Sequence, residues 1–246
     1  MDTVETLDRG DGGHLAYRRR DGAGPGVMFL GGFASDMDGA KASRLDAWAG
    51  EAGRAFLRFD YTGHGRSSGA FEDSTVSRWR DDALAALDGL SEGPQILVGS
   101  SMGAWIALLA ALARPERVKA LVLVAPAPDF TEALLWAGLP FHVKQAIETE
   151  GRWVQPSPYG GKTVITRTLI EDGRRWLLLD EPVTISAPVR ILQGWRDPDV
   201  PWSHAVRLLE ALTSDDVTLH LSKSGDHRLS SEGDLQRLIE TVESLG

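Results

Sequence analysis

Short apolar runs alternate along this chain with stretches that have helical spacing. The runs have strand length and lack the polar alternation of a half-exposed sheet; they cover residues 27–30, 55–59, 96–98 and 121–124. The stretches between them, residues 40–52, 77–90 and 104–114, have the spacing of helices. Wholly apolar short strands are typical of a parallel sheet whose two faces are both covered by helices. The sequence therefore predicts an α/β fold with a mostly parallel, doubly wound sheet.

The same rhythm resumes after Pro188, with strands expected at 189–192 and 217–221 and helices at 203–212 and about 232–245. Before the first run, two short segments flank the turn Gly10–Gly13, which predicts a β-hairpin. The chain has 246 residues, of which 42% are hydrophobic, so we expect one domain over residues 1–246.

The alternation breaks down between about residues 129 and 187. This stretch carries several tryptophans and prolines and is expected to form short helical pieces. A long insertion inside a compact sheet domain is usually functional and often covers a binding site. We therefore predict a cap insertion at about 129–187.

Composition excludes several kinds of chemistry. The chain has no cysteine, which removes disulfides, thiolate metal sites and cysteine nucleophiles. A net charge of −9 opposes binding to nucleic acid. No run approaches the roughly 20 apolar residues of a membrane span, and the first five residues lack the features of a signal peptide. We expect no transmembrane segment and a cytoplasmic protein.

The pattern Gly-x-Ser-x-Gly occurs twice, around Ser67 and around Ser101. Catalysis by such a serine requires a sharp turn between a strand and a helix, with the hydroxyl at the helix N-terminus. Only Ser101 has this context, because an apolar strand precedes it and a helix rich in alanine and leucine follows. We predict that Ser101 is the nucleophile and that Ser67 is a loop residue.

A serine hydroxyl needs a base, and histidine is the side chain whose pKa suits that role near neutral pH. His227 follows the last expected strand in a polar loop, where this fold places its base. His220 lies within that strand, and His64, between two glycines, is interpreted as shaping a turn. We predict that His227 is the base.

The imidazole in turn needs a carboxylate. Asp197 follows the strand at 189–192 after a short glycine-containing turn and is our first choice. Asp199 in the same loop and Asp129 after the strand at 121–124 remain alternatives. The order serine, acid, base is that of the α/β hydrolases. For the oxyanion hole we assign the backbone amides of Met102, which follows the nucleophile, and Phe33, after the Gly31–Gly32 pair.

Over essentially its whole length the sequence resembles the α/β-hydrolase superfamily. A closer likeness is to an abhydrolase family that is mitochondrial in animals, known for protein depalmitoylation and acyl-glucuronide hydrolysis, and to its bacterial relatives. The segments that carry it are residues 32–37, 59–63, 93–101, 151–157, 199–202 and 226–228. This chain has Leu30 where many superfamily members place a histidine before the glycine pair.

The resemblance implies a serine esterase or thioesterase with Ser101, Asp197 and His227 as its triad and with a small cap. Its substrate would be a small acyl ester or thioester, or an S-acylated protein, and no metal or organic cofactor is expected. Aromatic side chains could line an acyl pocket, and we name Trp105, Trp136, Trp153 and Tyr159. The alternatives are a hydrolase of another bond, such as a C–C hydrolase or a perhydrolase, and a weakly catalytic receptor for a small molecule.

Overall fold

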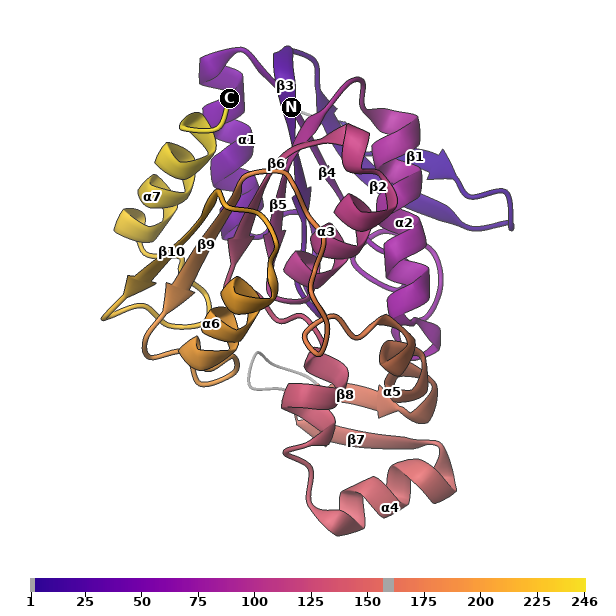
Figure 1. The fold of residues 1–246 in the computed structure, drawn as a ribbon. Coiled ribbons are helices and arrows are strands. Elements are labelled where there is room, and N and C mark those ends of the chain that lie inside the picture. Colours follow the sequence, from indigo (N-terminus) through magenta and orange to yellow (C-terminus); the bar gives the residue numbers. More distant parts are fainter. Residues whose placement is uncertain (1–2, 157–161) are drawn as a thin grey trace.

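The fold is built on one sheet of eight strands, seen in a computed structural model that describes residues 3–156 and 162–246 (Figure 1). Across the sheet the strands lie in the order β1-β2-β4-β3-β5-β6-β9-β10. Their bounds are β1 Glu5–Asp8, β2 His14–Arg20, β3 Ala23–Leu30, β4 Arg54–Phe59, β5 Gln95–Ser100, β6 Val118–Val124, β9 Val189–Gly194 and β10 Val217–Ser222. Six neighbouring strands, in the order β4-β3-β5-β6-β9-β10, pair in parallel. Strand β2 pairs antiparallel with both β1 and β4. The predicted mostly parallel α/β sheet is confirmed.

Helices cover both faces of this sheet, as Figure 1 shows. They are α1 Ala40–Ala52, α2 Val76–Leu90, α3 Met102–Ala113, α6 Trp202–Ala211 and α7 Glu232–Glu243, with short turns η1 Phe71–Asp73 and η2 Pro115–Arg117. Alternate residues of β3 enter different cores: Val27 and Phe29 pack with α1 and α7, whereas Met28 and Leu30 pack with α2 and α3. Burial on both faces is the reason why the strands lack polar alternation.

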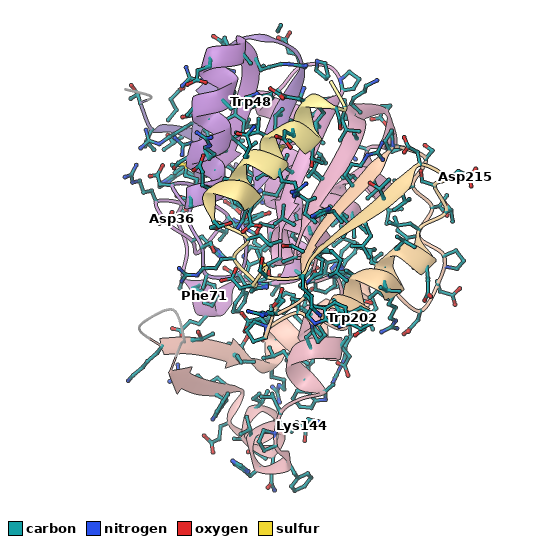
Figure 2. The ribbon with its side chains drawn as sticks, turned by 90° about the vertical axis from the view of Figure 1, so that its left-hand side faces the viewer. Asp36, Trp48, Phe71, Lys144, Trp202 and Asp215 are labelled. Carbon is teal, nitrogen blue, oxygen red and sulfur yellow. The ribbon has the colours of Figure 1, made fainter. Side chains whose placement is uncertain are left out.

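Residues 129–187, which we call the cap segment, extend from one end of the sheet. Figure 2 shows Phe71 and Trp202 where the sheet meets the cap segment, and Lys144 near its far tip. Its elements are η3 Thr131–Trp136, α4 Phe141–Glu150, β7 Arg152–Pro156, β8 Lys162–Thr166, α5 Arg167–Gly173 and η4 Arg174–Trp176.

The cap segment differs from the expected short helical pieces in one respect. Strands β7 and β8 form an antiparallel pair, with Trp153 opposite Ile165 and Val154 opposite Val164. Residues with β-branched and aromatic side chains favour strands, but prolines disfavour them, and the prolines in this stretch obscured the signal. The cap segment also has a small apolar core of its own, made of Val143, Ile147, Ile165 and Ile170.

Candidate active site

Ser101 lies in the turn that joins β5 to α3. Its backbone has φ +55° and ψ −118°, a conformation that side chains with a Cβ rarely adopt. The turn requires glycine on both sides: a Cβ on Gly99 would lie 2.5 Å from the carbonyl oxygen of Gly103, and one on Gly103 would collide with the Leu30 carbonyl. The sharp turn expected of a nucleophile is therefore present at Ser101.

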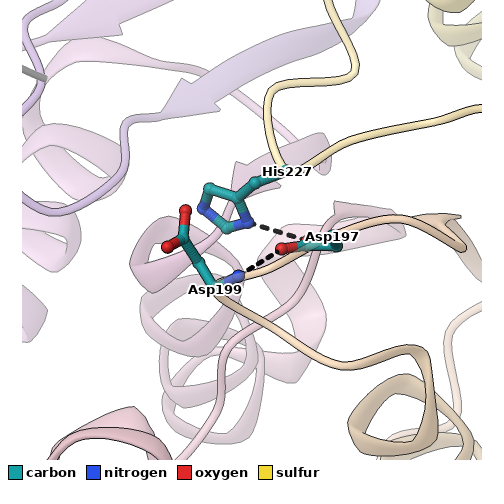
Figure 3. A group of neighbouring side chains, drawn as sticks. All are labelled: Asp197, Asp199 and His227. Atoms are coloured by element: carbon teal, nitrogen blue, oxygen red, sulfur yellow. Dashed lines mark hydrogen bonds and ion pairs between the residues drawn. The ribbon is translucent and has the colours of Figure 1, made fainter. Parts of the chain in front are cut away.

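Asp197 and His227 lie in the loops that follow the neighbouring strands β9 and β10. Nδ1 of His227 is 2.8 Å from Oδ2 of Asp197 (Figure 3). The Asp197 side chain is fully buried, and it also accepts hydrogen bonds from the amides of Asp199 and Val200 at 2.9 and 2.8 Å and from the Gln193 side chain at 3.2 Å. This carboxylate is held in one orientation and fixes the imidazole.

The rival acid, Asp199, has an exposed carboxylate. This carboxylate lies beside the edge of the His227 ring opposite Asp197 (Figure 3). Asp197, Asp199 and His227 each offer a polar atom within 4.8 Å of the other two. Nδ1 of His227 donates its hydrogen bond to Asp197, so the geometry favours Asp197 for the role of triad acid.

The third candidate, Asp129, is engaged elsewhere. Its carboxylate accepts hydrogen bonds from the amides of Leu178 and Leu179 at 2.8 and 2.9 Å, which ties the two ends of the cap segment together. Burial raises the pKa of Asp129. We therefore interpret Asp129 as a structural residue of the cap segment.

Ser101 and His227 line the same cavity, of about 360 Å³, together with Phe33 and Met102. Among the described residues, no hydrogen bond joins the Ser101 hydroxyl to His227. Such contacts are commonly long in an unliganded hydrolase and shorten when substrate binds. A second cavity of about 420 Å³ also contains Ser101 and His227 in its wall, so the serine lies between two open spaces.

The two amides assigned to the oxyanion hole lie against this cavity. Within residues 3–156 and 162–246, neither the Phe33 nor the Met102 amide has a hydrogen-bond partner. A Cβ on Gly32 would lie 3.5 Å from Cβ of Ser101, so the loop before Phe33 passes directly beside the nucleophile. Unused donors next to a reactive hydroxyl suit the binding of a developing negative charge.

Ser67, the serine of the other Gly-x-Ser-x-Gly pattern, uses its hydroxyl for the fold. The hydroxyl accepts a hydrogen bond from the Ala16 amide at 2.8 Å and donates one to the Asp60 carbonyl at 2.6 Å. These bonds join the loop after β4 to strand β2. The expected loop role agrees with this geometry.

Three of the four aromatic residues expected to line an acyl pocket lie elsewhere. Trp105, a residue of α3, is fully buried and donates its indole N–H to the Trp176 carbonyl at 3.2 Å. Trp136 and Trp153 pack on the small core of the cap segment, and Tyr159 lies outside the described residues. In the part of the chain that the structure describes, none of these tryptophans lines either cavity, because their surfaces are used in packing.

The first cavity is lined instead by smaller apolar side chains that the sequence analysis did not single out. They are Ala127, Phe130, Leu134, Leu135, Ile165 and Val200. Phe130 and the two leucines precede or lie in η3, and Ile165 lies in β8. For Phe130, Leu134, Leu135 and Ile165, the only signal in the sequence is their position within the predicted insertion.

His64 is buried beside the loop that carries Phe33, an environment that the sequence analysis did not predict. It is 4% exposed, and its Nε2 lies 3.1 Å from the Ala34 amide, in the loop that carries Phe33. Burial lowers the pKa of His64 to about 4. The imidazole is therefore neutral at physiological pH.

From the lowered pKa of His64 we predict how the free energy of unfolding depends on pH. Between a pKa of 6.5 in the unfolded chain and about 4 in the folded one, only the unfolded chain binds the proton. Stability should therefore fall as pH drops through this window, by about 3 kcal/mol relative to His64→Gln, which cannot titrate. Urea unfolding of both proteins at about pH 7 and about pH 4.5 measures the difference. Equal losses in both proteins would show that His64 does not titrate in this way.

Comparisons with known proteins agree with this fold. Residues 27–167 match the family described as serine aminopeptidase, S33. A hydrolase from Agrobacterium vitis S4 superposes with a TM-score of 0.94 at 41% identity, covering 100% of this chain and 98% of that one. Alpha/beta hydrolase domain-containing protein 10 from mouse superposes with a TM-score of 0.92 at 40% identity, covering 99% and 98%. The fold and these matches define a serine hydrolase of the α/β-hydrolase class.

Among curated proteins, the bovine mitochondrial palmitoyl-protein thioesterase ABHD10 is 41% identical over 245 residues, which cover 99% of this chain and 80% of that protein. The human protein of the same name is 40% identical over the same length. The chain belongs to the family of these ABHD10 thioesterases.

The names of these relatives contradict the predicted cytoplasmic location, because they designate mitochondrial proteins. The prediction rested on the lack of a membrane-length apolar run and of signal-peptide features, and neither observation identifies a compartment. No helix within residues 3–156 and 162–246 has the length and apolar character that crossing a membrane requires.

Proposed function

We propose that this protein hydrolyses acyl thioesters, including S-palmitoylated proteins, with Ser101 as nucleophile, His227 as base and Asp197 as acid. One observation carries the proposal: the wall of a single cavity contains Ser101 and a His227 whose Nδ1 is bound by a buried carboxylate. Relatives that are 40–41% identical are named palmitoyl-protein thioesterases, which supports the choice of substrate.

In the proposed mechanism, His227 takes the proton of the Ser101 hydroxyl as the oxygen attacks the acyl carbon. The Phe33 and Met102 amides bind the resulting oxyanion. His227 then gives its proton to the departing sulfur, which leaves as a thiol. Water attacks the acyl-enzyme, again with His227 as base, and the carboxylic acid is released.

We propose that the two cavities divide the substrate between them. The first, with Phe130, Leu134, Leu135 and Ile165 in its wall, is apolar enough for an acyl chain. The second has polar and charged lining side chains, including Ser35, Lys41 and Ser230, and would take the leaving group. Because η3 and β8 supply much of the apolar wall, we propose that residues 129–187 act as the cap of the site.

A substrate comparison tests the proposal. We expect the purified protein to release thiol from an S-palmitoyl peptide and from palmitoyl-CoA, and to cleave a p-nitrophenyl ester of medium chain length. Thiol release is followed with a disulfide reagent, and a sample fully labelled by a fluorophosphonate is the control for non-enzymatic cleavage. A protein that labels with the fluorophosphonate but releases no thiol would contradict the thioester assignment and leave the esterase class standing.

A further inference from the structure

His64 makes two hydrogen bonds that together define its tautomer. Nδ1 lies 3.2 Å from the Thr62 carbonyl, and Nε2 lies 3.1 Å from the Ala34 amide. A carbonyl can only accept, so Nδ1 carries the proton and donates it. Nε2 then has a free lone pair and accepts the Ala34 N–H. The neutral imidazole thus links the loop after β4 to the loop after β3.

The loop that His64 holds has a strained backbone. Ala34 has φ +56°, in the left-handed region that residues with a Cβ rarely adopt. Such a conformation costs free energy and persists only where surrounding contacts enforce it. Besides the bond to His64, the turn has a hydrogen bond from the Ser35 amide to the Gly32 carbonyl at 3.1 Å. His64 therefore supplies one of the contacts that fix the loop.

Aromatic packing fixes the imidazole itself. Its ring centroid lies 5.1 Å from that of Phe71 and 5.5 Å from that of Trp79. Phe33 packs edge-on against the same two rings, at 4.9 and 5.8 Å. His64 and Phe33 are thus held by a common aromatic cluster, and neither can shift without disturbing the contacts of the other.

We infer that His64 is a positioning residue of the oxyanion hole, which orients the Phe33 amide by holding the next amide along the chain, that of Ala34. His64 is not among the described residues that line the two cavities, so it acts through the backbone and not on the substrate. The inference rests on the proposed function, because it takes Phe33 as an oxyanion donor.

The test compares side chains that can or cannot accept the Ala34 N–H. In His64→Phe a ring of similar size fills the space without an acceptor, whereas His64→Gln offers a carbonyl oxygen. We expect His64→Phe to lower kcat on a p-nitrophenyl ester by about 10- to 100-fold with little change in KM, because oxyanion contacts strengthen in the transition state. His64→Gln should recover most of the loss.

Binding of a boronic acid, which forms a tetrahedral adduct with the serine, separates positioning from stability. His64→Phe should weaken this binding by about the same factor as it lowers kcat, whereas inhibition by a carboxylate product should be unchanged. All rates are expressed per site labelled by a fluorophosphonate, so that misfolded protein does not count. If His64→Phe fails to fold, His64→Asn replaces it, because the shorter amide cannot reach Ala34.

The outcomes distinguish the inference from the proposed function. Unchanged kcat per labelled site and unchanged boronate affinity in a folded variant without the acceptor would overturn the role of His64, even with thioesterase activity intact. A wild-type protein that cleaves only oxygen esters, with the expected dependence on residue 64, would overturn the thioester assignment and support the role of His64.

Discussion

Replacing Ser101 by alanine should lower kcat/KM on a thioester or a p-nitrophenyl ester by about a million-fold. The substitution removes the only atom that can form the acyl-enzyme in the proposed mechanism. Folding should be little affected, because the described structure has no hydrogen bond from the Ser101 hydroxyl. Initial rates give the loss of activity, and fluorophosphonate labelling should disappear with it.

Ser67→Ala is the matched control, because it changes the serine of the other Gly-x-Ser-x-Gly pattern. It removes hydrogen bonds to the Ala16 amide and the Asp60 carbonyl, and it should lower the free energy of unfolding by about 1 kcal/mol. Activity per folded molecule should stay within a few-fold of wild type. Substantial ester hydrolysis by Ser101→Ala would disprove the assignment of the nucleophile.

Asp197→Asn should lower kcat by about ten-thousand-fold, as expected when the acid of a triad becomes an amide. The asparagine can keep the hydrogen bonds from the Asp199 and Val200 amides, so the loop should retain its shape. Its side chain no longer stabilises a protonated His227 and can hold the imidazole in the wrong tautomer. Single-turnover rates with a p-nitrophenyl ester measure the acylation step directly.

Asp199→Asn separates the two carboxylates that flank His227. The exposed side chain of Asp199 should contribute less than tenfold to kcat, since charges in contact with solvent interact weakly. If Asp199→Asn lost more activity than Asp197→Asn, the acid would have to be reassigned to Asp199, against the hydrogen bond seen in Figure 3.

Most of the sheet could be predicted from the sequence because its strands are buried on both faces. Continuous apolar runs such as that of β6 leave little choice of structure between two helices. The β7–β8 hairpin was missed because its short strands lie in a segment without clear periodicity, where local preferences are weak. Contacts with η3 and α5, which no local pattern reveals, hold it in place.

In the candidate site, too, some features could be predicted from the sequence and others could not. The turn at Ser101 could be predicted because a nucleophilic serine demands a particular turn, and glycines at 99 and 103 mark that turn in the sequence. The residues that line the first cavity were not identified, because hydrophobicity predicts burial without saying which neighbours a side chain packs against. Trp105 illustrates this: α3 is buried from Met102 to Ala111, so the pattern could not tell which side faces the substrate.

His64 was interpreted as a residue that shapes a turn, which understated its contacts. Its partner Ala34 is 30 positions away, and its hydrogen bond depends on how the loops after β3 and β4 lie beside each other. The pairing of β3 with β4 sets that arrangement. The spacing of residues along the sequence does not predict such a hydrogen bond.

The separate small core of residues 143, 147, 165 and 170 has an evolutionary consequence. Mutations that reshape the apolar wall from η3 and β8 need not disturb the main cores beneath, which hold the Ser101 turn. Under the proposed function, natural variants could therefore exchange one acyl-chain preference for another while the Ser101 turn and the reaction stay the same.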